Sequence, residues 1–161
     1  YMAYNYFGAQ HYLDTLQCIN EILSIENLSK QLPYHANNIR LFSLVVHYEL
    51  GNHLLLENLV KTAYRQHKKT KVGKLEQLLF ELIKQLIKTP NKKHITLAFQ
   101  TFINKTQHLQ NEKNEEVAQS LLYFNFIAWA ESHVQQKSFA EIIQRKHNTH
   151  QKNFPDKPDD V

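Results

Sequence analysis

The sequence has few of the residues that form tight turns, disulfides or metal sites. Its 161 residues include three glycines and four prolines, and an all-β fold needs many more turn residues than that. The single cysteine, Cys18, excludes an intramolecular disulfide and any cysteine-rich zinc site. Because Cys18 lies among apolar residues, we expect it to be a small core residue rather than a reactive thiol.

Long apolar runs and targeting signals are also missing. The longest apolar stretch, residues 121–130, is interrupted by Asn125 and falls short of the roughly 18 apolar residues that a membrane span needs. The N-terminus has no basic region followed by an apolar core and a cleavage site. It begins at Tyr1 without an initiating methionine, so we expect the chain to be part of a longer protein. We expect a cytoplasmic location and no membrane span.

The positive charge is concentrated in one band. The formal net charge is +4, but residues 61–93 carry ten basic and two acidic residues, whereas residues 1–60 and 94–161 each carry more acidic than basic ones. Such a band is either a binding surface for an anionic partner or the solvated face of a helix. The first basic residues of the band are spaced so that they share one side of a helix, opposite its leucines. This spacing favours the interpretation as a solvated helix face.

What the sequence does contain is helical periodicity, clearest in residues 41–65. Apolar residues run up to Gly51, which can close a helix in the left-handed conformation, and Asn52 is a favourable N-cap for a second helix. So short a corner makes the two helices antiparallel neighbours. The first helix is apolar on nearly all sides, so we expect other helices to surround it.

Similar patterns along the rest of the chain predict an all-α fold with about eight helical segments and no β-sheet. The segments pair into about four antiparallel hairpins that form one helical-repeat domain over residues 1–147, at 1–25, 36–68, 74–108 and 114–147.

The pattern of the C-terminal third is less uniform. Residues 107–114 are polar and are predicted to form a loop, and residues 115–134 are predicted to form one long helix. Ser138 and Glu141 match a capping box that opens a last short helix. Residues 148–161 are predicted to be a polar C-terminal tail.

An internal repeat connects two glycine corners. Gly8 and Gly51 lie 43 positions apart, and the residues around them align as helix, glycine corner and helix. Leu50 and Gly51 are a large residue followed by a small one late in the first helix, and Ala63 follows twelve positions after Gly51, where the two helices would touch. This is the spacing of a tetratricopeptide repeat, and Phe7 with Gly8 matches its first part. The chain therefore resembles the TPR-like superfamily, although its repeat is longer than the usual one of that family.

That resemblance carries several expectations. It implies a right-handed superhelix of helical hairpins that binds a protein or peptide partner in a concave groove. The whole chain, including residues 129–143, also resembles the C-terminal part of longer bacterial helical-repeat proteins with no assigned activity.

Candidate chemical sites are sparse. His47, Glu49 and His53 are close in sequence, but residues two apart on a helix point in very different directions, so we expect no metal there. No nucleophile motif or glycine-rich phosphate loop occurs. We therefore predict no enzyme activity and no cofactor. The aromatic run Tyr123, Phe124, Phe126 and Trp129 is predicted to be core rather than a ligand pocket.

The function that the sequence favours is a non-catalytic protein-interaction or scaffolding module. Its candidate partner-binding residues are polar side chains on the helices expected to line the groove: Arg40, His47, Gln77, Glu81, Lys84 and Lys88.

Two alternatives remain. In the first, the chain is a weak binder of nucleic acid or of an acidic partner through the basic band 61–93, chiefly Lys61, Arg65, Lys68, Lys69, Lys71 and Lys74. In the second, it is a structural C-terminal cap of a longer helical solenoid. Aromatic residues do not alternate with the lysines of the band, as stacking on nucleic-acid bases requires, so nucleic acid is the less favoured partner.

Overall fold

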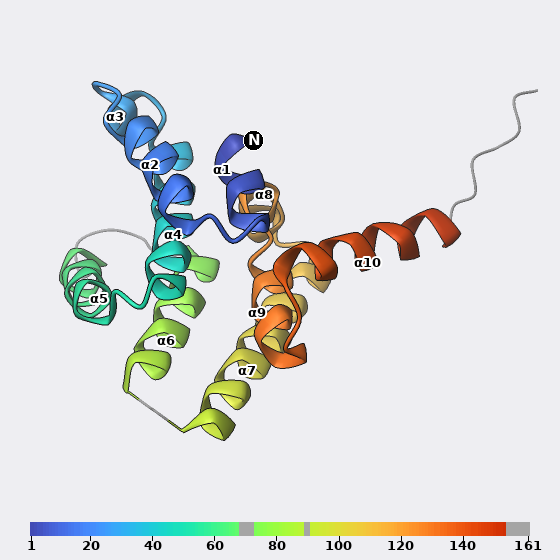
Figure 1. The fold of residues 1–161 in the computed structure, drawn as a ribbon. Coiled ribbons are helices and arrows are strands. Elements are labelled where there is room, and N and C mark those ends of the chain that lie inside the picture. The colour runs from blue at the N-terminus through green and yellow to red at the C-terminus, as the bar shows by residue number, and fades with distance from the viewer. Residues whose placement is uncertain (68–72, 89–90, 154–161) are drawn as a thin grey trace, which may run out of the picture.

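The computed structural model describes residues 1–67, 73–88 and 91–153, which form ten helices and no strand (Figure 1). The prediction of an all-α fold is confirmed. None of the helices in these ranges combines the length and apolarity required to cross a membrane. In chain order the helices are α1 (Met2–Gly8), α2 (Tyr12–Leu23), α3 (Leu28–Gln31), α4 (Pro33–Glu49), α5 (His53–His67), α6 (Lys74–Lys88), α7 (Lys92–Asn111), α8 (Glu115–Tyr123), α9 (Phe126–Gln135) and α10 (Phe139–Asn153).

Helix α4 is the central element. It begins with Pro33, a residue suited to the first turn of a helix, and it contacts α2, α3, α5, α6 and α8. Its buried residues lie on several sides of the helix, as expected for a helix surrounded by neighbours, and are Ala36, Asn38, Leu41, Phe42, Leu44, Val45 and Val46.

The corner after α4 forms as its sequence indicates. Gly51 adopts φ 71°, its N–H donates to the Tyr48 carbonyl at 3.0 Å, and the Asn52 N–H donates to the His47 carbonyl at 3.0 Å. These two bonds are those of a Schellman motif. The same motif closes α1, but there the left-handed residue is Gln10, with φ 62°, and not Gly8. The two glycines of the repeat thus have different conformations.

The predicted continuous helix over residues 115–134 is wrong. Helix α8 ends at Tyr123, Phe124 is extended with φ −152° and ψ 135°, and Asn125 caps α9 by accepting a hydrogen bond from the Ala128 N–H at 2.9 Å. The break turns the Phe124 side chain into the core, where it is fully buried.

Phe124 lies at the centre of a phenylalanine cluster, which comprises Phe7, Phe42, Phe124, Phe126 and Phe139. Its ring stacks on Phe42 with centroids 4.2 Å apart and on Phe139 with centroids 5.2 Å apart. Phe7 of α1 packs edge-on against Phe124, Phe42 and Phe139. The first and last helices therefore meet at the same cluster.

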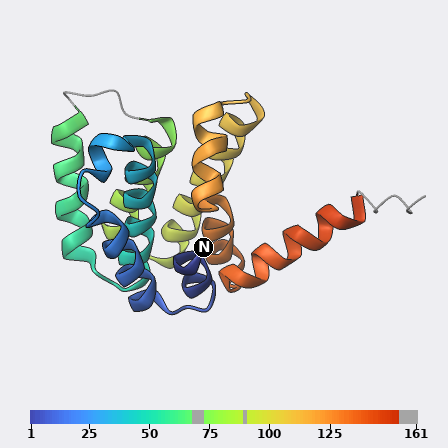
Figure 2. The ribbon, with the colours of Figure 1, turned by 90° about the horizontal axis from the view of Figure 1, so that it is seen from above.

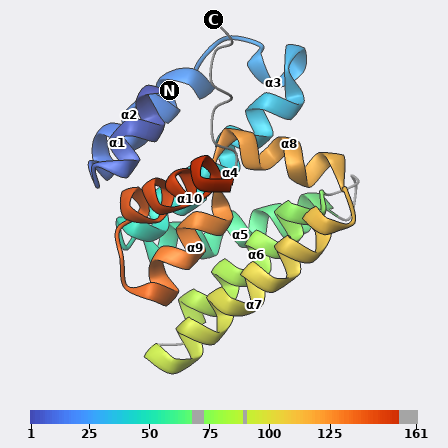
Figure 3. The same cartoon turned by 90° about the vertical axis from the view of Figure 1, so that its right-hand side faces the viewer.

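The predicted pairing of neighbouring helices is visible in several places. Helix α1 packs on α2, α4 on α5, and α6 on α7, and Figure 3 shows α6 and α7 side by side. In an open solenoid each unit contacts only its neighbours, whereas here Phe7 of α1 reaches Phe139 of α10. The superhelical order of the hairpins remains a prediction.

Two C-terminal boundaries differ from those predicted. Helix α7 continues to Asn111, into the predicted loop, and α10 continues to Asn153, beyond the predicted start of the tail at residue 148.

The predicted capping box of α10 is present, because the Glu141 carboxylate accepts from the Ser138 backbone N–H at 2.7 Å and from its hydroxyl at 2.8 Å. Figure 2 shows that α10 extends away from the other helices. Lys146 joins it to Glu131 of α9 at 2.9 Å.

Replacing Phe124 by alanine should lower the free energy of unfolding by about 3–5 kcal/mol, because it leaves a cavity between two stacked rings. Urea denaturation followed by the fluorescence of Trp129, the single tryptophan, measures this loss. Leu122→Ala is the matched control, because Leu122 is 85% exposed and its loss should change stability by less than about 0.5 kcal/mol. Equal effects of the two substitutions would show that burial of Phe124 does not stabilise the fold.

Acidification should weaken the start of α10. The pKa of Glu141 is lowered by its hydrogen bonds from the backbone and then the side chain of Ser138. A lowered folded-state pKa stabilises the helix above the unfolded pKa, and this contribution disappears as pH falls through the folded pKa. Ser138→Ala should raise the pKa of Glu141, measured by carboxyl-carbon NMR titration, whereas Ser138→Thr should keep it low. An unchanged pKa in Ser138→Ala would contradict this role of the hydroxyl.

Candidate functional site

The most concentrated polar chemistry among the described residues lies around Glu49, the last residue of α4. One Glu49 carboxylate oxygen accepts a hydrogen bond from Trp129 Nε1 at 2.6 Å and lies 2.7 Å from His133 Nε2. The Tyr12 hydroxyl donates to the same carboxylate. We call Tyr12, Glu49, Trp129 and His133 the Glu49 cluster. Its members come from α2, α4 and α9, so the cluster joins three helices.

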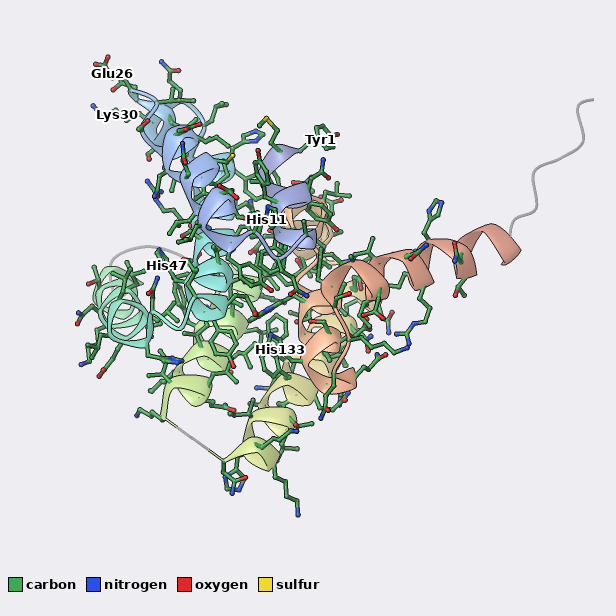
Figure 4. The ribbon with its side chains drawn as sticks, viewed as in Figure 1. Tyr1, His11, Glu26, Lys30, His47 and His133 are labelled. Carbon is green, nitrogen blue, oxygen red and sulfur yellow. The ribbon has the colours of Figure 1, made fainter. Side chains whose placement is uncertain are left out.

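Helix geometry explains how these groups meet. Trp129 and His133 are four residues apart on α9 and thus share one face. Tyr12 begins α2 and meets the end of α4, so α2 and α4 run antiparallel. Phe99 of α7 stacks on the His133 ring, with centroids 4.4 Å apart and planes 4° apart. In Figure 4, His133 lies on the inner side of α9.

Burial and the carboxylate perturb two tyrosines of this region. The pKa of Tyr12 is raised to about 12, first by burial and then by the charge and hydrogen bond of Glu49. The pKa of Tyr48 is also raised to about 12, by burial and then by the Glu49 charge. Both tyrosines therefore stay neutral over the physiological range and serve as donors and packing groups rather than as bases.

A carboxylate beside an imidazole can in principle transfer protons. Here the Glu49 side chain is 14% exposed and that of His133 is 28% exposed, and the carboxylate already has donors on α2 and α9. This geometry satisfies a nearly buried charge, which a folded protein requires. We therefore interpret the Glu49 cluster as a structural connection between helices. In the part of the chain that the structure describes, no group of three or more His, Cys, Asp or Glu side chains is placed to hold a metal ion.

Sequence reasoning considered Glu49 only with His47 and His53. Its partners on α9 lie 80 and 84 positions away, and Tyr12 lies on α2. Only the four-residue spacing of Trp129 and His133 was visible in the sequence as a signal. The aromatic prediction is confirmed for Phe124, Phe126 and Trp129, which are buried, while Tyr123 is half-buried.

A second polar contact joins α4 to α8. The Tyr34 hydroxyl lies 3.1 Å from the Ser120 hydroxyl, and the Tyr123 hydroxyl forms a hydrogen bond with His35 Nδ1. Asn37, on the same part of α4, donates to Glu76 of α6 at 3.2 Å. These contacts hold α8 and α6 on the central helix.

The structure separates the six predicted groove residues into two sets. Gln77, Glu81, Lys84 and Lys88 form one exposed stripe along α6, and Glu81 pairs with Lys105 of α7 at 3.3 Å. Arg40 instead bonds to Ser29 of α3. His47 lies 3.1 Å from the Asn52 side chain, toward α5 in Figure 4, and burial lowers its pKa.

The predicted basic band is described only in part. Lys61 is exposed and pairs with Glu57 at 2.7 Å, and Lys74 is exposed at the start of α6. Arg65 belongs to α5, but its side chain lies outside the described part of the chain, as do Lys68, Lys69 and Lys71 entirely.

Helix α5 carries an unusual apolar surface. It lies at one edge of the molecule in Figures 1 and 2 and packs on α4 and α6. Leu56 and Val60 are buried against the body, but Leu54, Leu55 and Leu59 are 80%, 43% and 36% exposed. We call these three exposed leucines the α5 surface. The helical periodicity of residues 41–65 predicted a helix here but did not identify this surface.

Glu49→Gln should lower the pKa of Tyr12 from about 12 while leaving it above the usual 10.0, because burial remains when the charge is removed. A raised folded-state pKa stabilises the fold below the unfolded pKa, so that contribution is lost as pH rises from about 10 to about 12. NMR titration of ring-labelled tyrosine, assigned with Tyr12→Phe, measures the shift. Glu57→Gln is the exposed control, and an equal shift in both variants would contradict the contact.

Comparison of the chain with protein-family models, with curated proteins and with solved structures finds no match. The resemblance to the TPR-like superfamily is therefore still a prediction. The function of the chain has to be inferred from the Glu49 cluster, the α6 stripe and the α5 surface.

Proposed function

We propose that this chain is a non-catalytic protein-interaction module that binds its partner through the α5 surface. The observation that carries this proposal is the exposure of Leu54, Leu55 and Leu59 on successive turns of one helix. A single exposed leucine is ordinary, but neighbouring ones form an apolar patch of the kind that marks interaction sites.

The position of α5 supports the same function. The helix packs on α4 and α6 through Leu56 and Val60, so its fold is maintained without the exposed leucines. The exposed leucines are not needed for the core. Removing them from water would lower the free energy, and this requires another surface to cover them. Lys88, on the exposed stripe of α6, lies near enough to Glu57 of α5 for its charge to lower the pKa of Glu57.

The polar chemistry of the interior supports a non-catalytic role. Glu49, the most enclosed of the paired carboxylates together with Glu131, is satisfied by Trp129 and Tyr12. The His133 ring stacks on Phe99, and its Nε2 atom lies within hydrogen-bond distance of Glu49. These side chains hold helices together, and the interaction proposal assigns no reaction to them.

A photo-crosslinking residue tests the proposal in the cells that make the protein. Placed at Leu55, it should form a discrete covalent adduct with another protein, because the partner would lie on that side chain. Mass spectrometry of the adduct identifies the crosslinked peptide.

The control carries the same residue at Leu97 of α7, which is 63% exposed on a helix distant in sequence. It should form no such adduct. If position 55 yields no adduct, or the same diffuse set of adducts as position 97, the α5 surface is not an interaction site.

A further inference from the structure

We infer that the α5 surface binds an acidic amphipathic helix of a partner protein. This inference rests on the proposed function and adds the chemistry and the secondary structure of the partner. It follows from the width of the apolar face, from the charges along its edge, and from the repulsion that a second copy of the chain would meet.

The width of the leucine face fits a helix. At about 100° per residue, Leu54, Leu55 and Leu59 cover about 140° of the circumference of α5. Asn58 and Thr62, which share this face, are polar but small and exposed. A helix needs an apolar stripe a little more than about 100° wide to pack on another helix. The face is therefore suited to a second helix with apolar residues three and four positions apart.

The edge between this face and α6 is positively charged. Glu57 lies there with Lys61, and its pKa is lowered first by the hydrogen bond to Lys61, then by the Lys61 charge, and further by Lys88 of α6. One carboxylate thus lies between two cations. Lys84 extends the exposed stripe of α6 beside Lys88, and Glu81 on the same stripe pairs with Lys105 of α7 at 3.3 Å. With these pairs included, lysines outnumber carboxylates, so the edge carries net positive charge.

This charge decides between the occupants. Two copies of the chain that met through the same face would bring two net-positive edges together, as a two-fold interface requires, and like charges across an interface oppose binding. Nucleic acid would gain nothing from a leucine face, since it is bound through phosphate contacts and base stacking. A helix with apolar residues on one side and glutamates or aspartates beside them complements both the leucines and the lysines.

Two synthetic helical peptides of about 20 residues, long enough to form helix, test the inference. Both carry leucines at the same helical spacing, and they differ only in flanking glutamates or flanking lysines. Fluorescence anisotropy at low salt should show the glutamate peptide binding about tenfold more tightly, as two or three exposed charge pairs provide. Added salt should reduce this difference. Equal binding of the two peptides, or tighter binding of the lysine peptide, overturns the inference.

Variants of the protein locate the site. Leu55→Asp should weaken the glutamate peptide about tenfold, as loss of an apolar anchor does, while Leu97→Asp should leave its affinity unchanged. Lys88→Glu should weaken the glutamate peptide and strengthen the lysine peptide. Circular dichroism verifies that each variant is folded. Equal losses in Leu55→Asp and Leu97→Asp, or no exchange of preference in Lys88→Glu, overturn the inference.

The experiments distinguish failure of this inference from failure of the proposed function. A crosslinked peptide at position 55 that is neutral or basic supports an interaction module but overturns the acidic partner. Sedimentation that shows a dimer abolished by Leu55→Asp identifies a second copy instead and also overturns it. The absence of any adduct at position 55 overturns both.

Discussion

The stacking of Phe124 between Phe42 and Phe139 is the interaction on which the rest of the structure depends. It requires the chain to leave helical geometry at Phe124 and Asn125, which costs backbone hydrogen bonds, and the Asn125 side chain restores one of them by capping α9. In return the break places a large aromatic ring where α1, α4 and α10 converge. Because Phe7 contacts the same ring, residues from both ends of the described chain pack in one core.

The Glu49 cluster is the polar counterpart of this contact. A carboxylate at the end of a buried helix is unfavourable unless donors surround it, and here the donors come from α2 and α9. The cluster therefore fixes the distance between helices that no turn connects directly. The same arrangement gives these interior side chains a packing and supporting role, and the proposed function relies on the surface instead. There, α5 carries exposed leucines, and the charge of Lys88 of α6 reaches Glu57 of α5. Apolar area beside positive charge favours a partner with an apolar face and negative charge.

Much of the local structure was predictable from the sequence because it depends on neighbouring residues. The all-α class, the burial of α4, the left-handed Gly51 and the capping box at Ser138 follow from periodicity and from side chains within one turn. Other local features were not predictable in this way. Gln10 adopts the left-handed conformation in place of Gly8, since the hydrogen bonds of the corner, rather than the residue type alone, select the position that closes a helix.

The tertiary structure alone decided which faces meet. The sequence determined that residues 115–134 favour helix, but the gain from burying Phe124 outweighed helix continuity and divided the segment. The sequence also determined the leucine period of α5, but whether Leu55 lies inside like Leu56 depends on which neighbours α5 receives. Contacts such as Glu49 with His133 join residues 84 positions apart. Periodicity describes one helix at a time, whereas these contacts arise from the packing free energy of several helices together.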